Sequence, residues 1–159
     1  MESFDDPRLT VTEALALRQV IDRALEASRS ENRNGIAAAI VSGEQILQVA
    51  ENEVNTFSDP TKHAEMVALA ALSQREDRKE LGDCTLISSL QPCEMCLSAL
   101  RFAGIKRVIY AATQERVAAK YFVFPKLKIM DFQTAGEHFE QLGGIGEDEV
   151  IHLYATGKE

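Results

Sequence analysis

Hydrophobic positions follow a helical period at the start of the chain and a strand period after it. Between residues 9 and 28, apolar side chains recur every three or four positions, which predicts an amphipathic helix. Thr10 and Glu13 have the spacing of a capping box, so we expect this helix to begin there. Residues 36–50 hold two apolar runs around a Ser-Gly-Glu turn, and this pattern predicts an antiparallel hairpin.

The middle of the chain alternates between helix-like and strand-like segments. Asp59 and Pro60 have the chemistry of a helix start, with a side-chain acceptor followed by proline, and an apolar segment follows them. Residues 75–83 are mostly charged and predict a solvated helix end. Further along, we expect a strand at 84–89, a helix from Pro92 to Gly104 and a strand at 106–112. Strands that alternate with a helix predict a parallel pair joined by a right-handed crossover.

The pattern weakens after residue 113. Residues 128–139 favour a helix, whereas residues 149–155 fit a packed strand better than a short terminal helix. The chain has no repeat, no low-complexity segment and no gap long enough to be a linker. At 159 residues it has the length of one ordinary domain, so we expect residues 1–159 to form a single domain.

Composition and charge exclude several classes of protein. The chain is 45% apolar and 26% charged, and no apolar run reaches the ~18 residues of a membrane span. Its acidic start, MESFDDPRLT, has neither the basic residues nor the apolar core of a signal peptide, so we expect a cytoplasmic protein without a membrane partner. A net charge of −8 repels phosphate backbones, which argues against nucleic acid as a partner.

The three cysteines suggest candidate chemistry. Cys93 and Cys96 stand three apart behind Pro92, whereas Cys84 lies in a predicted strand. The pair fits a disulfide, a redox dithiol, half of a structural zinc site or half of a catalytic metal site. In a reducing compartment the disulfide is the least favoured of these. Both sulfurs are expected on one face at a helix start, where the helix dipole lowers the cost of a thiolate.

A histidine and a glutamate at another predicted helix start offer the missing groups. His63 could supply the further ligand that tetrahedral zinc needs. Glu65 lies in an apolar run, and burying a carboxylate there without a partner would cost several kcal/mol by order of magnitude. We therefore predict one Zn²⁺ held by His63, Cys93 and Cys96, with its fourth position open to water, as in catalytic sites. Spacing alone does not aim Glu65 at this metal, because positions i and i+2 lie about 200° apart on a helix.

These motifs resemble a known family. His63-Ala64-Glu65 followed by Pro92-Cys93-Glu94-Met95-Cys96 matches the H-x-E and P-C-x-x-C signature of zinc nucleobase deaminases. The sequence DPTKHAEM at residues 59–66 is similar to the D-P-T-x-H-A-E motif of one branch of the cytidine deaminase-like superfamily. That branch contains guanine deaminases and tRNA adenosine deaminases. The resemblance covers roughly residues 9–112. It implies an α/β fold with three α-β-α layers, a five-stranded mixed sheet and a homodimer.

The resemblance also implies roles for individual residues. Zinc would activate a water molecule, and Glu65 would act as general acid and base in hydrolytic deamination. Asn52 would bind the base through its amide, although a turn asparagine is the alternative, and the backbone N–H of Ala64 would bind the base carbonyl. Residues 113–159 would cover the substrate. Candidate contacts in that region are Glu115, His152 and Tyr154.

The expected substrate is a small free base or nucleoside. A guanine-type purine is favoured, although Glu115 is one residue out of register with the acid that guanine deaminases carry after the fourth strand, and Gln91 replaces the glutamate common before the Pro-Cys pair. The alternatives are tRNA adenosine deamination, cytosine or cytidine deamination, and a non-enzymatic binding module with structural zinc. The acidic net charge argues against a tRNA substrate.

Overall fold

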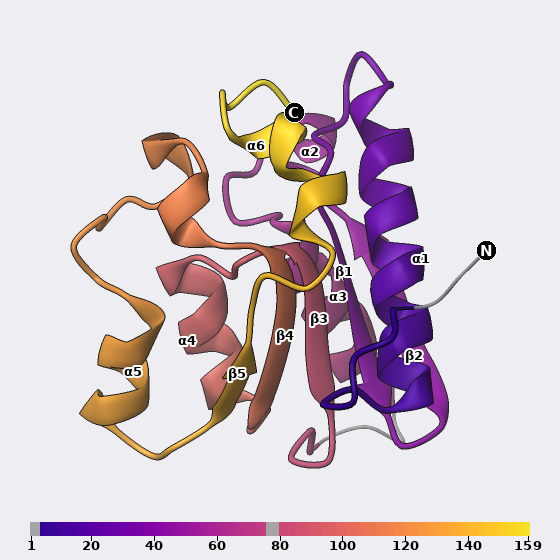
Figure 1. The fold of residues 1–159 in the computed structure, drawn as a ribbon, viewed down its shortest axis with the longest axis vertical. Coiled ribbons are helices and arrows are strands. Elements are labelled where there is room, and N and C mark those ends of the chain that lie inside the picture. Colours follow the sequence, from indigo (N-terminus) through magenta and orange to yellow (C-terminus); the bar gives the residue numbers. More distant parts are fainter. Residues whose placement is uncertain (1–3, 76–79) are drawn as a thin grey trace.

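The computed structural model describes residues 4–75 and 80–159, which form a sheet between layers of helices (Figure 1). The strands are β1 (Ala37–Ser42), β2 (Gln45–Glu51), β3 (Thr85–Leu90), β4 (Arg107–Ala112) and β5 (Glu140–Leu142). The helices are α1 (Val11–Ser28), α2 (Val54–Phe57), α3 (Ala64–Ser73), α4 (Glu94–Phe102), α5 (Ile129–Ala135) and α6 (Ile151–Tyr154). Short 3-10 helices are η1 (Gln114–Arg116), η2 (Ala119–Tyr121) and η3 (Glu147–Glu149).

The five strands lie in the order β2-β1-β3-β4-β5 and form a mixed sheet. β1 pairs antiparallel with β2 and β3, whereas β3, β4 and β5 run parallel to one another. Helix α1 packs on one face of the sheet, and α3 and α4 lie on the other (Figure 1). The expected α/β fold with three layers and a five-stranded mixed sheet is therefore confirmed.

Most of the predicted elements are present in the structure. The hairpin of residues 36–50 is β1 and β2, and Gly43 makes its turn with a φ of 56° that most other residues avoid. The strand expected at 84–89 is β3, and β3, α4 and β4 form the predicted parallel crossover. β3 is buried along its whole length, because helices cover both of its faces. Part of the predicted solvated segment, residues 76–79, lies outside the described residues.

The two helices that carry the candidate ligands begin later than predicted. Helix α3 begins at Ala64 with His63 as its N-cap, so the prediction that Asp59 and Pro60 start it was wrong. The Asp59 carboxylate instead accepts hydrogen bonds from the backbone N–H of Thr61 at 2.9 Å and from its hydroxyl at 2.7 Å, which closes a separate turn. Helix α4 likewise begins at Glu94, with Cys93 as its N-cap.

The terminal region contains the other differences. The strand favoured for residues 149–155 was wrong, because this segment forms α6. Tyr154 of α6 is fully buried, and its hydroxyl donates to the carbonyl oxygen of Gly35 at 2.6 Å and lies 2.8 Å from Ser89 Oγ. The fifth strand, β5, has only three residues, which is too short for a strand period to be visible in the sequence. No described helix is both long and apolar enough to cross a membrane.

The predicted capping box of α1 is present, and it connects that helix to the sheet. Thr10 Oγ1 accepts from the backbone N–H of Glu13 at 3.0 Å, and the Glu13 carboxylate accepts from the backbone N–H of Thr10 at 2.9 Å. The same carboxylate, 4% exposed, accepts from Arg107 Nε of β4 at 2.8 Å. Burial raises the pKa of Glu13, but the hydrogen bonds from Arg107 and Thr10 outweigh it, so the pKa is lowered overall.

A Glu13→Gln variant is therefore expected to lose about 1.5–3 kcal/mol of unfolding free energy near pH 7. The lowered pKa means that stabilisation by Glu13 is complete above its ordinary pKa of 4.5 and is lost as the pH falls through the lowered value. Urea unfolding of both proteins near pH 7 and below about pH 4 measures the difference, which should shrink in acid. A Glu140→Gln control removes an exposed partner of the same Arg107 and should change stability by less than about 1 kcal/mol. An equal loss at both pH values would contradict this role of the Glu13 charge.

Candidate active site

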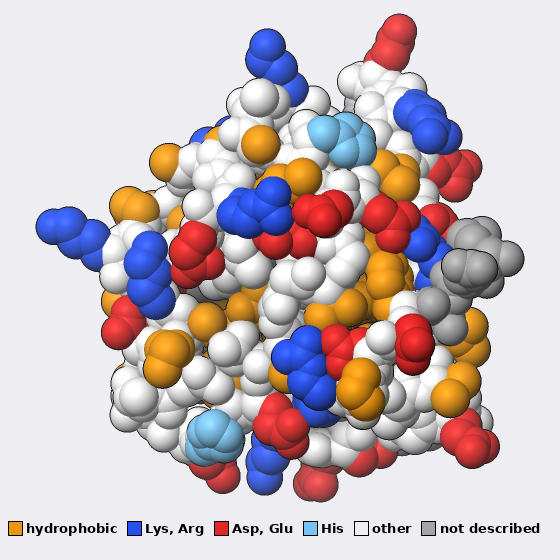
Figure 2. Space-filling model, in the orientation of Figure 1, with side chains coloured by type: hydrophobic (Ala, Val, Ile, Leu, Met, Phe, Trp, Pro, Cys, Tyr) orange, Lys and Arg blue, Asp and Glu red, His pale blue; other side chains and the backbone are white. Residues whose placement is uncertain are grey.

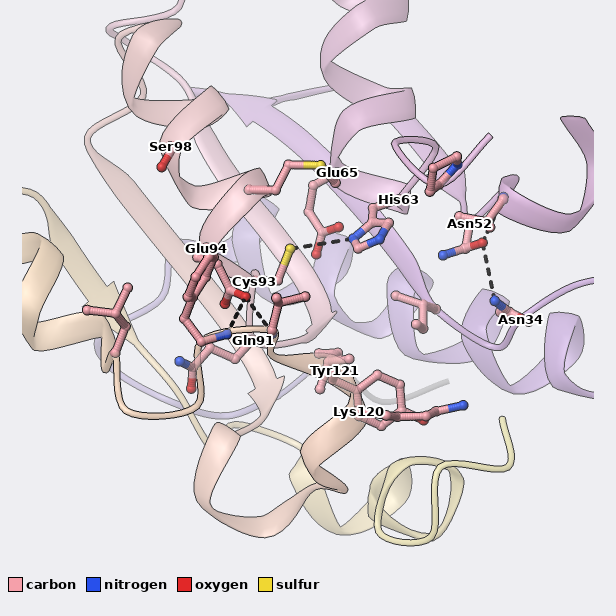
Figure 3. A pocket seen from close by; sticks show the side chains of 18 of the residues that line it. Asn34, Asn52, His63, Glu65, Gln91, Cys93, Glu94, Ser98, Lys120 and Tyr121 are labelled. Atoms are coloured by element: carbon pink, nitrogen blue, oxygen red, sulfur yellow. Dashed lines mark hydrogen bonds between the residues drawn. The ribbon is translucent and has the colours of Figure 1, made fainter. Parts of the chain in front are cut away.

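One histidine and two cysteines meet at the starts of α3 and α4, and Figure 3 shows two of them, His63 and Cys93, side by side. His63 Nδ1 lies 3.5 Å from the Sγ atoms of both Cys93 and Cys96, and the two sulfurs are 3.6 Å apart. Tetrahedral zinc with ordinary Zn–N and Zn–S bonds separates its ligands by roughly 3.5–3.8 Å. The three donor atoms therefore fit a single zinc ion, and three protein ligands leave a fourth position for another molecule.

The fold brings these ligands together from distant parts of the sequence. His63 is the N-cap of α3, Cys93 is the N-cap of α4, and Cys96 is the third residue of α4. The two helices lie on the same face of the sheet, and their first turns meet beyond the carboxyl end of β3. Both helix dipoles present their positive ends at this place, which favours the thiolate form of the cysteines.

The two sulfurs differ in acidity. The hydrogen bond between the Cys93 and Cys96 sulfurs, together with the contact to His63, lowers the pKa of Cys93 to about 5 against the opposing effect of burial. The same hydrogen bond and burial raise the pKa of Cys96. The hydrogen bond to Cys93 also raises the pKa of His63. Cys93 therefore ionises readily, and the thiolate is the form that binds metal.

Glu65 lies beside the cluster without belonging to it. Its carboxyl group is 4% exposed, with Oε2 3.5 Å from Cys96 Sγ and Oε1 2.9 Å from the Ser88 hydroxyl. Burial, followed by the charge of Cys93, raises the pKa of Glu65. His63 is an N-cap with extended backbone (φ −63°, ψ 153°), so the 200° separation expected between positions i and i+2 of a helix does not apply. His63 and Glu65 can therefore face the same point.

Ser88 supports a carboxyl group that can hold a proton. The Ser88 hydroxyl lies 2.7 Å from the carbonyl oxygen of Leu90 as well as 2.9 Å from Glu65 Oε1. A hydroxyl has one proton to donate, so both hydrogen bonds form together only when Glu65 itself carries a proton. The raised pKa of Glu65 also favours the protonated form of its carboxyl group.

A cavity of about 790 Å³ opens beside the cluster, and Asn52 lies in its wall (Figure 3). Asn52 is 6% exposed, and its Oδ1 accepts from the backbone N–H of Val54 at 3.0 Å and from Asn34 Nδ2 at 3.5 Å. Because only the oxygen can accept these bonds, the NH₂ group of Asn52 is the one turned toward His63. Asn52 therefore presents a hydrogen-bond donor to the cavity.

The other predicted substrate contacts lie in different surroundings. Ala64 is the first residue of α3, where backbone N–H groups have no acceptor within the helix. Glu115 and His152 are exposed, Tyr154 is fully buried, and none of these three lines the cavity. Tyr154 belongs to α6 and is directed into the core, where its hydroxyl donates to the carbonyl oxygen of Gly35.

Several cavity residues were not found from the sequence. The Glu94 carboxylate accepts from the backbone N–H groups of Val123 and Phe124, which ties that loop to the start of α4. Lys120, Tyr121 and Glu159 line the same cavity. No local pattern singles out these residues, because they come from separate parts of the chain: Glu94 begins α4, Lys120 and Tyr121 belong to η2, and Glu159 follows α6. Ser88 could have been found from the sequence, because Ser88 and Ser89 are adjacent polar residues in a strand that is otherwise apolar apart from Thr85.

Comparisons with known proteins agree with this geometry. Residues 11–112 match the family described as the cytidine and deoxycytidylate deaminase zinc-binding region. The chain is 37% identical over 89 residues to the tRNA-specific adenosine deaminase of Aquifex aeolicus, covering 56% of this chain and 59% of that protein. It is 34% identical over 106 residues to the guanine deaminase of Bacillus subtilis, covering 67% of this chain and 68% of that protein. The structure of a guanine deaminase from Nitrosomonas europaea shares the fold at 20% identity, with a TM-score of 0.74 over 96% of this chain and 93% of the other.

Proposed function

This chain belongs to the cytidine and deoxycytidylate deaminase zinc-binding family, and from that premise we propose that it hydrolytically deaminates a small free base or nucleoside, with a guanine-type purine as the first choice. The observation that carries the proposal is the buried Glu65 carboxyl beside the triangle of His63, Cys93 and Cys96. A deaminase needs both an activated water and a group that moves protons, and these residues are the types that supply them.

The mechanism assigns one task to each group. A zinc ion held by His63, Cys93 and Cys96 would lower the pKa of a water molecule and so supply a nucleophile near neutral pH. Glu65 takes one proton of the attacking water and passes it to the ring nitrogen of the substrate. It then carries the second proton of that water to the amino group, so that ammonia leaves as the carbonyl forms. Its raised pKa suits this task, because the carboxyl holds a proton closer to neutral pH than an exposed glutamate does.

The substrate assignment rests on the cavity. Its volume, about 790 Å³, suits a small molecule up to the size of a nucleoside. The NH₂ group of Asn52 would donate to an acceptor on the base edge, and the backbone N–H of Ala64 would do the same for a carbonyl oxygen. Within this chain, we propose that residues 1–159 act as one deaminase domain in which residues 113–159 cover the substrate. A homodimer stays a prediction from the family resemblance.

Deamination of adenosine in tRNA is the second candidate, because relatives with that activity match as well as the guanine deaminase does. The net charge of −8 argues against it, since a tRNA surface requires clustered basic residues. On the face shown in Figure 2, Lys and Arg side chains are interspersed with Asp and Glu side chains and form no broad basic patch. A free base or nucleoside is therefore the better supported substrate.

Ammonia release across a panel of amines tests the proposal. The panel contains guanine, guanosine, adenine, adenosine, cytosine, cytidine, amino-triazines and an adenosine-containing tRNA anticodon stem. We expect guanine or guanosine to give a kcat/KM about tenfold or more above the others, because a site that hydrogen-bonds one base edge rejects bases that leave its polar groups unpaired. Fastest turnover of the tRNA stem would favour the second candidate, and no ammonia from any compound would contradict both.

A further inference from the structure

Glu159 lines the same cavity as His63, Glu65 and Cys93. Its side chain is only 6% exposed, and its Oε2 lies 3.3 Å from Lys120 Nζ and accepts a hydrogen bond from the Tyr121 hydroxyl. Its Oε1 has no hydrogen-bond donor within residues 4–75 and 80–159. One oxygen of a nearly buried carboxylate is therefore available to a molecule in the cavity.

Packing from the sheet outward holds Glu159 in this position. The Tyr121 ring meets the Tyr154 ring edge to face, with centroids 5.8 Å apart, and the Tyr154 hydroxyl is anchored in the core at Gly35. Burial and the Glu159 carboxylate raise the pKa of Tyr121, so its hydroxyl stays protonated and can donate. Gly157, at a φ of 74°, lets the chain turn closely against Lys120, where a Cβ would lie 3.0 Å from Cε. Glu159 is thus positioned before any substrate arrives.

The charges around the cavity indicate what Glu159 would bind. Among the residues that the structure describes, three carboxyl groups line the cavity, those of Glu65, Glu94 and Glu159, and one ammonium group, that of Lys120, which is already paired with Glu159. Even with Glu65 protonated, the carboxylates of Glu94 and Glu159 outweigh the one ammonium group, so this wall repels phosphate groups and attracts neutral hydrogen-bond donors. The free oxygen of Glu159 therefore suits an N–H or O–H group of an uncharged substrate.

We propose that Glu159 is a specificity-determining residue, whose Oε1 accepts a hydrogen bond from the part of the substrate that lies away from the reacting carbon. The donor would be a ring N–H of a free purine base or a ribose hydroxyl of a purine nucleoside, which share this chemistry. The inference rests on the proposed deaminase function and adds to it a residue that reads the far end of the substrate.

Steady-state kinetics of Glu159→Gln and Tyr121→Phe test the proposal, with guanine, 9-methylguanine and guanosine as substrates. Glu159→Gln should raise KM roughly 10- to 100-fold, as expected for loss of a hydrogen bond to a charged group, while kcat and the zinc content stay unchanged. Tyr121→Phe should raise KM in the same direction by a smaller factor, because it removes the hydrogen bond that orients the carboxylate. Glu137→Gln, at a 74% exposed glutamate paired with Arg101, is the matched control and should leave KM unchanged.

The substrate that responds identifies the donor. If Glu159→Gln raises the KM above the wild-type value for guanosine alone, the contact is to the ribose. If it raises the KM for guanine but not for 9-methylguanine, the contact is to the ring N–H. Unchanged KM values for all three substrates in both folded variants, with an active wild-type protein, would overturn the role of Glu159 and leave the proposed function intact. A wild-type protein that deaminates none of the three would overturn both.

Discussion

Replacing Glu65 with glutamine is expected to lower kcat by about 10²- to 10⁴-fold, the usual contribution of a general acid and base. Glutamine has nearly the same size and keeps the hydrogen bond to Ser88, but it cannot take up or release a proton at neutral pH. The zinc content should stay at its wild-type value, because Glu65 is not one of the three residues in the ligand cluster. Ammonia release and zinc analysis on the same preparation measure both effects.

A Ser88→Ala variant tests the same proton transfer by a milder change. It removes the hydroxyl that lies 2.9 Å from Glu65 Oε1 and leaves the carboxyl group itself in place, so we expect a smaller loss of kcat and a shifted pH profile. A Glu65→Gln protein that deaminates as fast as the wild type would rule out Glu65 as the proton carrier. A Glu65→Gln protein that loses zinc together with activity would instead make Glu65 part of the metal site.

Replacing Cys96 with serine is expected to remove both the metal and all measurable deamination. Cys96 is fully buried and lies within 3.6 Å of the other two donor atoms, so its loss leaves two ligands where zinc needs at least three from the protein. Since metal binding contributes to folding free energy, the variant should also melt several degrees lower, at roughly 2–4 °C for each kcal/mol lost. Zinc analysis, ammonia release and thermal melting measure the three effects.

Controls separate this metal site from the redox alternative for the same cysteines. Cys84→Ala changes a buried cysteine outside the cluster and should keep the wild-type zinc content. A strong chelator should abolish activity and added zinc should restore it, whereas a thiol reductant should change nothing. Activity that depends on the reductant and survives the chelator would favour a redox dithiol, and a zinc-loaded, active Cys96→Ser protein would contradict the proposed ligand set.

Much of the fold could be predicted because its signals are local. The capping box of Thr10 and Glu13, the hairpin around Gly43 and the alternation of β3, α4 and β4 each depend on neighbouring residues. The error in predicting where α3 begins also has a local cause. Asp59 and Pro60 suit both a helix start and a tight turn, and the choice between these depends on the side-chain contact to Thr61.

The sequence by itself determined the chemistry of this protein, because His63, Glu65, Cys93 and Cys96 stand in two short motifs whose residue types suit zinc and proton transfer. Only the tertiary structure decided how those groups face one another and which residues surround the substrate. His63 and Glu65 point to one place because His63 is an extended N-cap. Glu159 reaches the cavity because Tyr154 and Tyr121 pack behind it, a contact between positions far apart in the chain that leaves no local pattern.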